Sequence, residues 1–152
     1  MYKRQDLLFI FIGDGSLKNY LLSKYKIDNI SNLKIIPSIK NSEIPFYLNS
    51  SEALILPSLA EGMSNAVLES MSCAIPVIST DVGDIKEFIK DNYNGLIINK
   101  KDPEDIAKKV EYLLNSKKSD IFGKRARETI IKKGLSWEKS AADYIKIYNK
   151  VI

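Results

Sequence analysis

The chain has 152 residues, no histidine, one cysteine and a formal net charge of +4. This length corresponds to one domain with a hydrophobic core, and 45% hydrophobic with 28% charged residues is typical of a folded globular protein. Without histidine the chain can form neither a Ser-His-Asp triad nor a His-ligated metal site. The single cysteine, Cys73, excludes an internal disulfide framework and a cysteine-rich zinc site.

The basic residues alternate with acids along helix-like segments, as around Lys108-Lys109 and Lys132-Lys133. This pattern favours solvated helix faces, so we expect no nucleic-acid partner, and an anionic membrane or polymer surface stays open as the alternative. The sequence shows no apolar run of 18 residues and no signal-peptide pattern. With one unpaired cysteine, these features predict a cytoplasmic location, with peripheral binding at the inner face of the membrane left open.

Residues 1–6 are interpreted separately from the rest of the chain. The codons GTG TAT AAG AGA CAG encode the first five residues, and that string resembles the transposon end used to prepare sequencing libraries. We expect this segment to be a sequencing scar or a disordered start, outside the fold. Leaving out Lys3 and Arg4 lowers the formal net charge from +4 to +2, which weakens the case for a polyanionic partner.

Short apolar runs alternate with helical stripes along the chain. We expect strands at Leu7–Ile12, Leu33–Ile39, Ala53–Pro57, Ile75–Ser79 and Gly95–Ile98. We expect helices at 16–26, 42–49, 62 or 64 to 72, 84–90, 103–115, 119–133 and 137–150. This alternation predicts an α/β fold with a doubly wound parallel sheet, in which ligands bind beyond the carboxyl ends of the strands.

Several elements carry more specific signals. The unbroken apolar run at Leu7–Ile12 predicts a strand that is buried on both faces, and Pro37 predicts the end or edge of the second strand. Asp102 is a predicted helix N-cap with Pro103 in the first helical position. Cys73 is expected to be a buried structural thiol.

The turn Gly13-Asp14-Gly15 follows the first predicted strand. A dinucleotide-binding G-x-G-x-x-G pattern would need a third glycine where Lys18 stands. We therefore interpret the two glycines as a tight strand-to-helix turn. The sequence also contains no G-x-x-x-x-G-K-[ST] phosphate-binding loop.

The most informative stretch runs from Pro57 to Glu69. A strand ends, a loop carries the carboxylate of Glu61, and a helix begins near Ser64 and places Glu69 one turn further on. Between the two carboxylates, the start of the helix offers free N–H groups and the positive end of its dipole to a phosphate. This order suits a nucleotide-sugar, which has hydroxyls at both ends of a diphosphate. The spacing alone favours the alternative interpretation, in which Glu61 is an exposed loop glutamate and Glu69 a solvated helix glutamate.

The stretch Glu61–Glu69 resembles the Glu-x7-Glu motif of the retaining family 4 glycosyltransferases. Other motifs of that family match in order: Phe11–Gly15 resembles its "vGdG" turn, Leu56–Ser58 the strand before the motif, Met71–Ile78 "MACGxPVI", Thr80–Glu87 "TdvGGxxE", and Asn94–Ile98 with Asp102-Pro103 "nGllv…dp". The resemblance covers residues 7–150. It implies the Rossmann-like, C-terminal half of a GT-B glycosyltransferase, which binds the donor.

The resemblance also implies roles for individual residues. Glu61 would be the catalytic residue that positions the donor hexose, Glu69 would bind the ribose hydroxyls, and Ile39 would contact the base through its backbone. The remaining donor-binding residues would be Gly13, Gly62, Met63, Ser64, Asn65 and Ala66. The expected donor is a UDP- or GDP-sugar, and no metal or other cofactor is expected.

In domain terms, the resemblance implies a nucleotide-sugar-binding domain over 7–136 and a crossover helix over 137–152. The family's first C-domain strand, its basic residues for the pyrophosphate and its N-terminal acceptor domain would be missing here. The implied reaction is retaining transfer of a hexosyl unit to a glycan or lipid-linked acceptor in surface polysaccharide synthesis, with the isolated chain inactive. A subunit of a split enzyme, a non-catalytic nucleotide-binding module and a related epimerase remain the alternatives.

Three positions depart from the family pattern. Ala74 stands where glycine is usual past a helix end, which costs about 1–2 kcal/mol if its φ is positive. Asp84 replaces the second glycine of a pair, and Pro37 also replaces a glycine. On the last helix, Tyr144, Tyr148 and Val151 are expected to form an exposed apolar patch.

Overall fold

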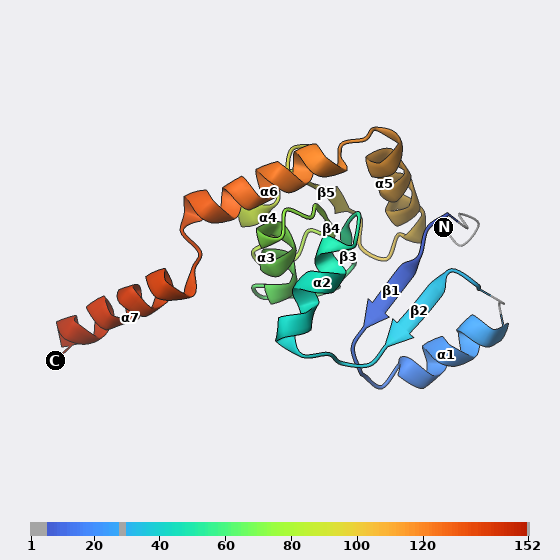
Figure 1. Ribbon diagram of the computed structural model, residues 1–152, viewed down its shortest axis with the longest axis horizontal. Helices are drawn as coiled ribbons and strands as arrows, with labels where there is room; N and C mark the ends of the chain where they lie inside the picture. The colour runs from blue at the N-terminus through green and yellow to red at the C-terminus, as the bar shows by residue number, and fades with distance from the viewer. Residues whose placement is uncertain (1–5, 28–29, 152) are drawn as a thin grey trace. The chain divides into compact units, whose positions relative to one another are not determined.

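The computed structural model describes residues 6–27 and 30–151 (Figure 1). The interpretation of the first residues as a scar therefore falls almost wholly outside the described residues. The chain divides into two compact units, residues 1–44 and 45–152. Both units contain parallel strands connected through helices, which confirms the predicted α/β fold. The described strands form one hydrogen-bonded sheet in each unit.

The first unit contains a two-stranded parallel sheet. Its elements are β1 (Phe9–Ile12), α1 (Lys18–Ile27), β2 (Leu33–Ile36) and the short 3-10 helix η1 (Asn41–Glu43). Phe9 pairs with Leu33 and Ile12 with Ile36, and the N–H of Gly13 donates to the carbonyl of Ile36 at 3.0 Å. Strand β2 ends immediately before Pro37, as predicted, because proline has no N–H to continue the ladder.

The prediction that the first strand is buried on both faces is wrong. Ile10, Phe11 and Ile12 are 40%, 51% and 41% exposed. In the part of the chain that the structure describes, β1 pairs with β2 alone. Two strands and one helix cannot cover both faces of β1, so its apolar run stays half exposed.

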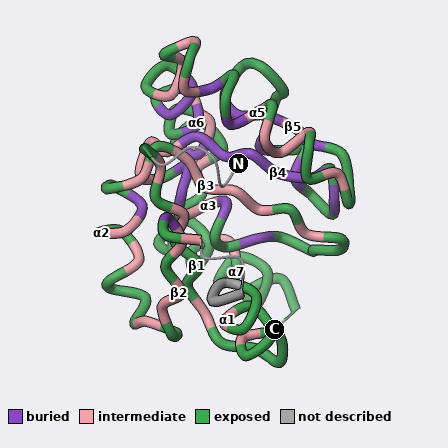
Figure 2. Tube along the Cα trace, turned by 90° about the vertical axis from the view of Figure 1, so that its right-hand side faces the viewer, coloured by how far each residue is buried: buried purple, intermediate pink, exposed green. Residues whose placement is uncertain are grey.

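The second unit contains a three-stranded parallel sheet with the order β3-β4-β5. Its elements are α2 (Ile44–Asn49, whose first residue belongs to the other unit), β3 (Leu54–Leu56), α3 (Asn65–Ser72), β4 (Val77–Thr80), α4 (Ile85–Phe88), β5 (Gly95–Ile98), α5 (Pro103–Asn115), α6 (Ser119–Lys133) and α7 (Trp137–Val151). All four residues of the central strand β4 are buried (Figure 2). The core forms where α3 and α6 pack on this sheet and α4 packs on α6. It includes Val67, Met71, Val77, Ile85, Phe88, Ala126 and Ile130.

Helix boundaries in the second unit follow the local sequence signals. The carboxylate of Asp102 accepts the N–H of Asp105 at 2.9 Å, which confirms the predicted N-cap of α5. Helix α6 ends at Gly134, whose φ of +63° is readily adopted by glycine. Helix α7 has no buried residue, and Tyr144, Tyr148 and Val151 are exposed as expected.

Candidate functional site

The start of α3 is the centre of the candidate site. Its N-cap residue, Ser64, is buried and extended, and the Ser64 side chain does not cap the helix. The N–H groups of Asn65, Ala66 and Val67 have no partner within the helix, because the first turn of any α-helix lacks the preceding carbonyls. Asn65 and Ala66 are exposed. The positive end of the helix dipole is therefore accessible to an anion.

Glu61 lies in the loop between β3 and α3, and a chain of hydrogen bonds orients it. The Ser58 hydroxyl donates to Oε1 of Glu61 at 2.8 Å. The Ser58 carbonyl in turn accepts the Thr80 hydroxyl at 2.6 Å. Thr80 is the last residue of β4, so these bonds link the carboxyl ends of two adjacent strands. The exposed Glu61 carboxylate is thus anchored to the rigid sheet.

The loop after β4 packs directly against the Glu61 loop. Gly83 has a φ of +51°, and a Cβ atom at this position would lie 2.4 Å from the carbonyl oxygens of both Glu61 and Gly62. The N–H of Asp84 points to the carbonyl of Gly62 at 3.5 Å. Asp84 itself has a φ of −90°, which any residue adopts. The structure therefore requires glycine at position 83, and position 84 accommodates an aspartate without backbone strain.

Glu69 lies one turn into α3 and is half-buried. Cys73 lies four residues after Glu69, and burial raises the pKa of its thiol. The positive charge of Arg127 acts to lower this pKa, and the negative charge of Glu69 acts to raise it further. The sequence predicted a buried thiol, but Cys73 is only partly buried. Cys73 is the C-cap residue of α3.

The other two predicted donor residues, Gly13 and Ile39, belong to the first unit. Gly13 has a φ of +141° and open space where a Cβ atom would lie, which confirms the tight glycine turn. Ile39 is half-buried. Next to Gly13, the Asp14 carboxylate pairs with Lys18 and accepts the Ser38 N–H at 2.8 Å. These two contacts, of which that with Lys18 has the larger effect, lower the pKa of Asp14 to about 2.

The structure thus brings Glu61, Gly62 and the start of α3 together within residues 45–152. Sequence reasoning missed Ser58 and Thr80, which hold the Glu61 loop. Ser58 and Glu61 are only three residues apart in the same loop, and this closeness in the sequence is the one signal for the first contact. Across residues 6–27 and 30–151, no three acidic or cysteine side chains are placed to hold a metal ion. No helix in these same stretches is long and apolar enough to cross a membrane.

Comparison with known proteins identifies the family. The family model described as "Glycosyl transferases group 1" matches residues 1–129. The uncharacterised glycosyltransferase MJ1178 of Methanocaldococcus jannaschii is 31% identical over 147 residues, which are 96% of this chain and 41% of that protein. The Escherichia coli UDP-Gal:alpha-D-GlcNAc-diphosphoundecaprenol alpha-1,3-galactosyltransferase is 30% identical over 127 residues, which are 83% of this chain and 33% of that protein.

Solved structures agree on the fold. TarM matches with a TM-score of 0.82 at 27% identity, over 97% of this chain and 30% of its own. Sucrose-phosphate synthase from Thermosynechococcus elongatus matches with a TM-score of 0.87 at 20% identity, over 99% of this chain and 40% of its own. The chain spans about two fifths or less of each of these proteins. It folds as the Rossmann-like C-terminal domain of a GT-B glycosyltransferase, and it belongs to the glycosyl transferases of group 1.

Proposed function

We propose that this chain binds the nucleotide-sugar donor of a retaining hexosyltransferase. The observation that carries the proposal is the Glu61 loop, which Ser58, Thr80 and Gly83 hold immediately before the uncapped start of α3. A carboxylate followed by free backbone N–H groups can bind a hexose and the diphosphate attached to it. The half-buried Glu69 follows on the same helix.

Each part of this site has a distinct task in the proposal. The N–H groups of Asn65 and Ala66, with the helix dipole, stabilise the negative charge that develops on the leaving diphosphate. Glu61 accepts hydrogen bonds from hexose hydroxyls and positions the sugar for transfer with retention of configuration. Glu69 accepts hydrogen bonds from the ribose hydroxyls. Gly62, Met63 and Ser64 shape the loop.

The names of related proteins support this donor class. The galactosyltransferase of Escherichia coli is named for a UDP-sugar donor and a lipid-linked acceptor, and HepE from Anabaena, which shares the fold at 17% identity, was crystallised with UDP-glucose. We therefore propose a UDP- or GDP-sugar as donor and a glycan or lipid-linked molecule as acceptor. The acceptor would bind to a part of the protein outside this chain, so the isolated chain should bind donor weakly and transfer no sugar.

Donor binding is tested by calorimetric titration of the chain with UDP, UDP-sugars and GDP-sugars. The change Glu69→Ala removes a hydrogen bond to a charged group, which is worth about 1.5–3 kcal/mol, so donor affinity should fall about 10- to 150-fold. Glu111→Ala, which removes an exposed carboxylate from α5, is the matched control and should leave affinity unchanged. Equal affinity for the Glu69→Ala variant and the unchanged chain would reject the assignment.

The reaction itself is tested in a protein that joins this chain to an acceptor-binding half. Proton NMR of the product compares its anomeric configuration with that of the donor. Retention supports the proposal, and inversion contradicts it. Glu61→Ala should lower kcat in this protein, because the donor sugar loses the carboxylate that positions it.

A further inference from the structure

Two side-chain hydrogen bonds continue the contact between β3 and β4 beyond the end of their backbone ladder. The ladder ends at the pair Leu56 and Ser79, and Pro57, the residue after β3, has no N–H to extend it. The Ser79 hydroxyl donates to the Leu56 carbonyl at 3.1 Å, and the Thr80 hydroxyl donates to the Ser58 carbonyl at 2.6 Å. Ser58 is thereby fixed to the central strand of the sheet, although it lies outside β3.

The Ser58 hydroxyl fixes one oxygen of the Glu61 carboxylate. It donates to Oε1 at 2.8 Å. Because the Ser58 carbonyl, and not its hydroxyl, accepts the bond from Thr80, both contacts exist together. Among residues 6–27 and 30–151, Oε2 of Glu61 has no hydrogen-bond or ion-pair partner. One oxygen is thus held, and the other can accept a hydroxyl from a ligand.

The burial of these side chains distinguishes their tasks. Thr80 is 1% exposed, Ser58 is half-buried and Glu61 is exposed. A ligand that contacts Glu61 therefore does not reach the Thr80 side chain. An exposed glutamate without a partner has several conformations, and it loses this freedom when a ligand binds, which weakens binding. A glutamate that is already held in one conformation avoids this loss.

We propose that Ser58 is a positioning residue for the donor sugar and that Thr80 acts through it. Ser58 orients Glu61 before the donor binds, so that the carboxylate accepts a hexose hydroxyl without a further loss of side-chain freedom. Thr80 in turn fixes the position of Ser58. This inference rests on the proposed donor site, in which Glu61 binds the hexose.

The test compares the affinity of the full chain for a sugar nucleotide with its affinity for the nucleotide alone. Calorimetric titrations pair UDP-glucose with UDP and GDP-mannose with GDP. Ser58→Ala should lower the ratio of these two affinities about 2- to 12-fold, because Glu61 must then be ordered during binding. Affinity for the nucleotide alone should stay the same. Ser119→Ala, which removes a hydroxyl bonded to the Glu52 carbonyl at 2.7 Å, is the matched control and should change neither affinity.

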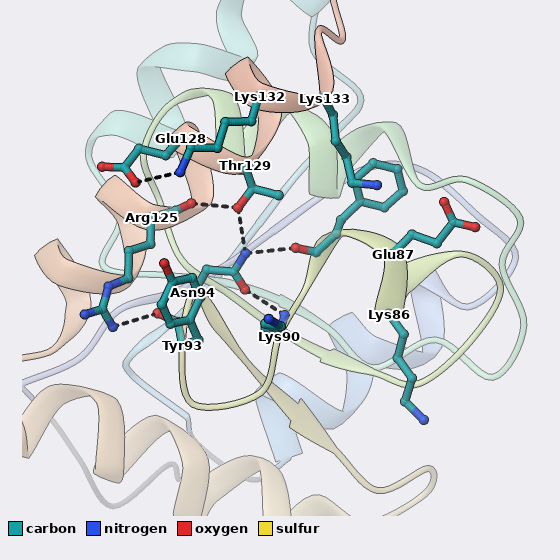
Figure 3. Close-up of a pocket in the computed structure, with 11 residues that line it drawn as sticks. Lys86, Glu87, Lys90, Tyr93, Asn94, Arg125, Glu128, Thr129, Lys132 and Lys133 are labelled. Carbon is teal, nitrogen blue, oxygen red and sulfur yellow. Dashed lines mark hydrogen bonds and ion pairs between the residues drawn. The ribbon is translucent and has the colours of Figure 1, made fainter.

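Variants of Thr80 test whether it acts through Ser58. Thr80→Val should lower the same affinity ratio, and Thr80→Ser, which keeps the hydroxyl, should restore it. Thr129→Val is the control for a loss of stability. The Thr129 hydroxyl donates to the Arg125 carbonyl at 2.8 Å in a pocket lined by α4, the turn before β5 and α6, which contains none of the donor-site residues (Figure 3). This variant should destabilise the fold and leave the ratio unchanged.

A double variant tests the order of the two contacts. Ser58→Ala combined with Thr80→Val should lower the affinity ratio no further than Ser58→Ala alone, because residues that act through one contact are not additive. A further fall by the full effect of Thr80→Val would contradict the proposal that Thr80 acts through Ser58.

The outcomes separate this inference from the function on which it rests. If neither sugar nucleotide binds, or if Glu61→Ala leaves the affinity ratio unchanged, the proposed donor site fails and the positioning role fails with it. If Glu61→Ala lowers the ratio and Ser58→Ala does not, only the positioning role is overturned. An equal fall in Thr129→Val would also overturn it, because a general loss of stability would then explain the effect.

Discussion

At the scale of single residues, Gly83 and Ala74 show how backbone conformation limits this site. Both have positive φ, +51° at Gly83 and +59° at Ala74. The alanine carries a strain of about 1–2 kcal/mol, as expected for a residue with a side chain in this region. A Cβ atom at Gly123 would lie 1.9 Å from the Ala74 carbonyl oxygen, so α6 packs closely on this turn. Ala74 therefore retains the glycine-like backbone conformation that the family pattern implies.

Gly83→Ala should destabilise the fold by about 2 kcal/mol or more, because the new methyl group adds a clash with the Glu61 loop to the strain of a positive φ. Urea unfolding measures this change. Gly62→Ala is the control, since a Cβ atom there meets nothing within 4 Å, and its free energy of unfolding should change by less than about 1 kcal/mol. An unaltered unfolding midpoint in Gly83→Ala would contradict the role of this glycine.

Asp14 gives a prediction for pH dependence in the first unit. Its pKa is lowered to about 2, chiefly by the hydrogen bond from Lys18 and then by that from the Ser38 N–H. A carboxyl with a lowered pKa in the folded state stabilises the fold above its unfolded pKa of 3.8 and loses this effect as the pH falls toward 2. NMR titration of the carboxyl carbon should therefore give a midpoint near 2. Lys18→Met should raise the pKa of Asp14 toward 3.8, and Lys24→Met, on the same helix, should not.

At the scale of elements, α5 shows the value of a local signal. Asp102 accepts the Asp105 N–H at 2.9 Å and thereby caps the helix. Asp102→Ala should lower the free energy of unfolding by about 1 kcal/mol, because a backbone donor loses its partner. Asp102→Asn retains an acceptor oxygen and should cost only a few tenths of a kcal/mol. Chemical denaturation of both variants checks the difference, and equal losses would exclude a capping role.

At the scale of the whole molecule, α7 is a helix without a buried face. None of its residues is buried, and Trp137, the one tryptophan of the chain, is 90% exposed. Deleting residues 137–152 should therefore leave the unfolding midpoint of the remaining chain nearly unchanged and reduce self-association, since apolar surface is removed. Circular dichroism during urea unfolding, with sedimentation of the native samples, tests both expectations. A loss of more than about 1 kcal/mol would show that α7 packs on the core in solution.

Much of the fold was predictable because its signals are local. The alternation of apolar runs and helical stripes located the strands and helices, Pro37 marked the end of β2, and Asp102 marked the start of α5. The Glu61–Glu69 stretch, together with the motifs around it, identified the family. These features depend on residues close in the sequence, which determine secondary structure and turns before any long-range contact forms.

Only the tertiary structure decided which segments meet. It showed that Ser58 and Thr80 hold the Glu61 loop, and that Gly83 must lack a side chain because the carbonyls of another loop occupy that space. It left β1 half exposed, although its apolar run predicted burial. It also brought residues of α4, the turn before β5 and α6 together around one pocket. These properties arise from contacts between segments that are distant along the chain, which periodicity and motif spacing do not encode.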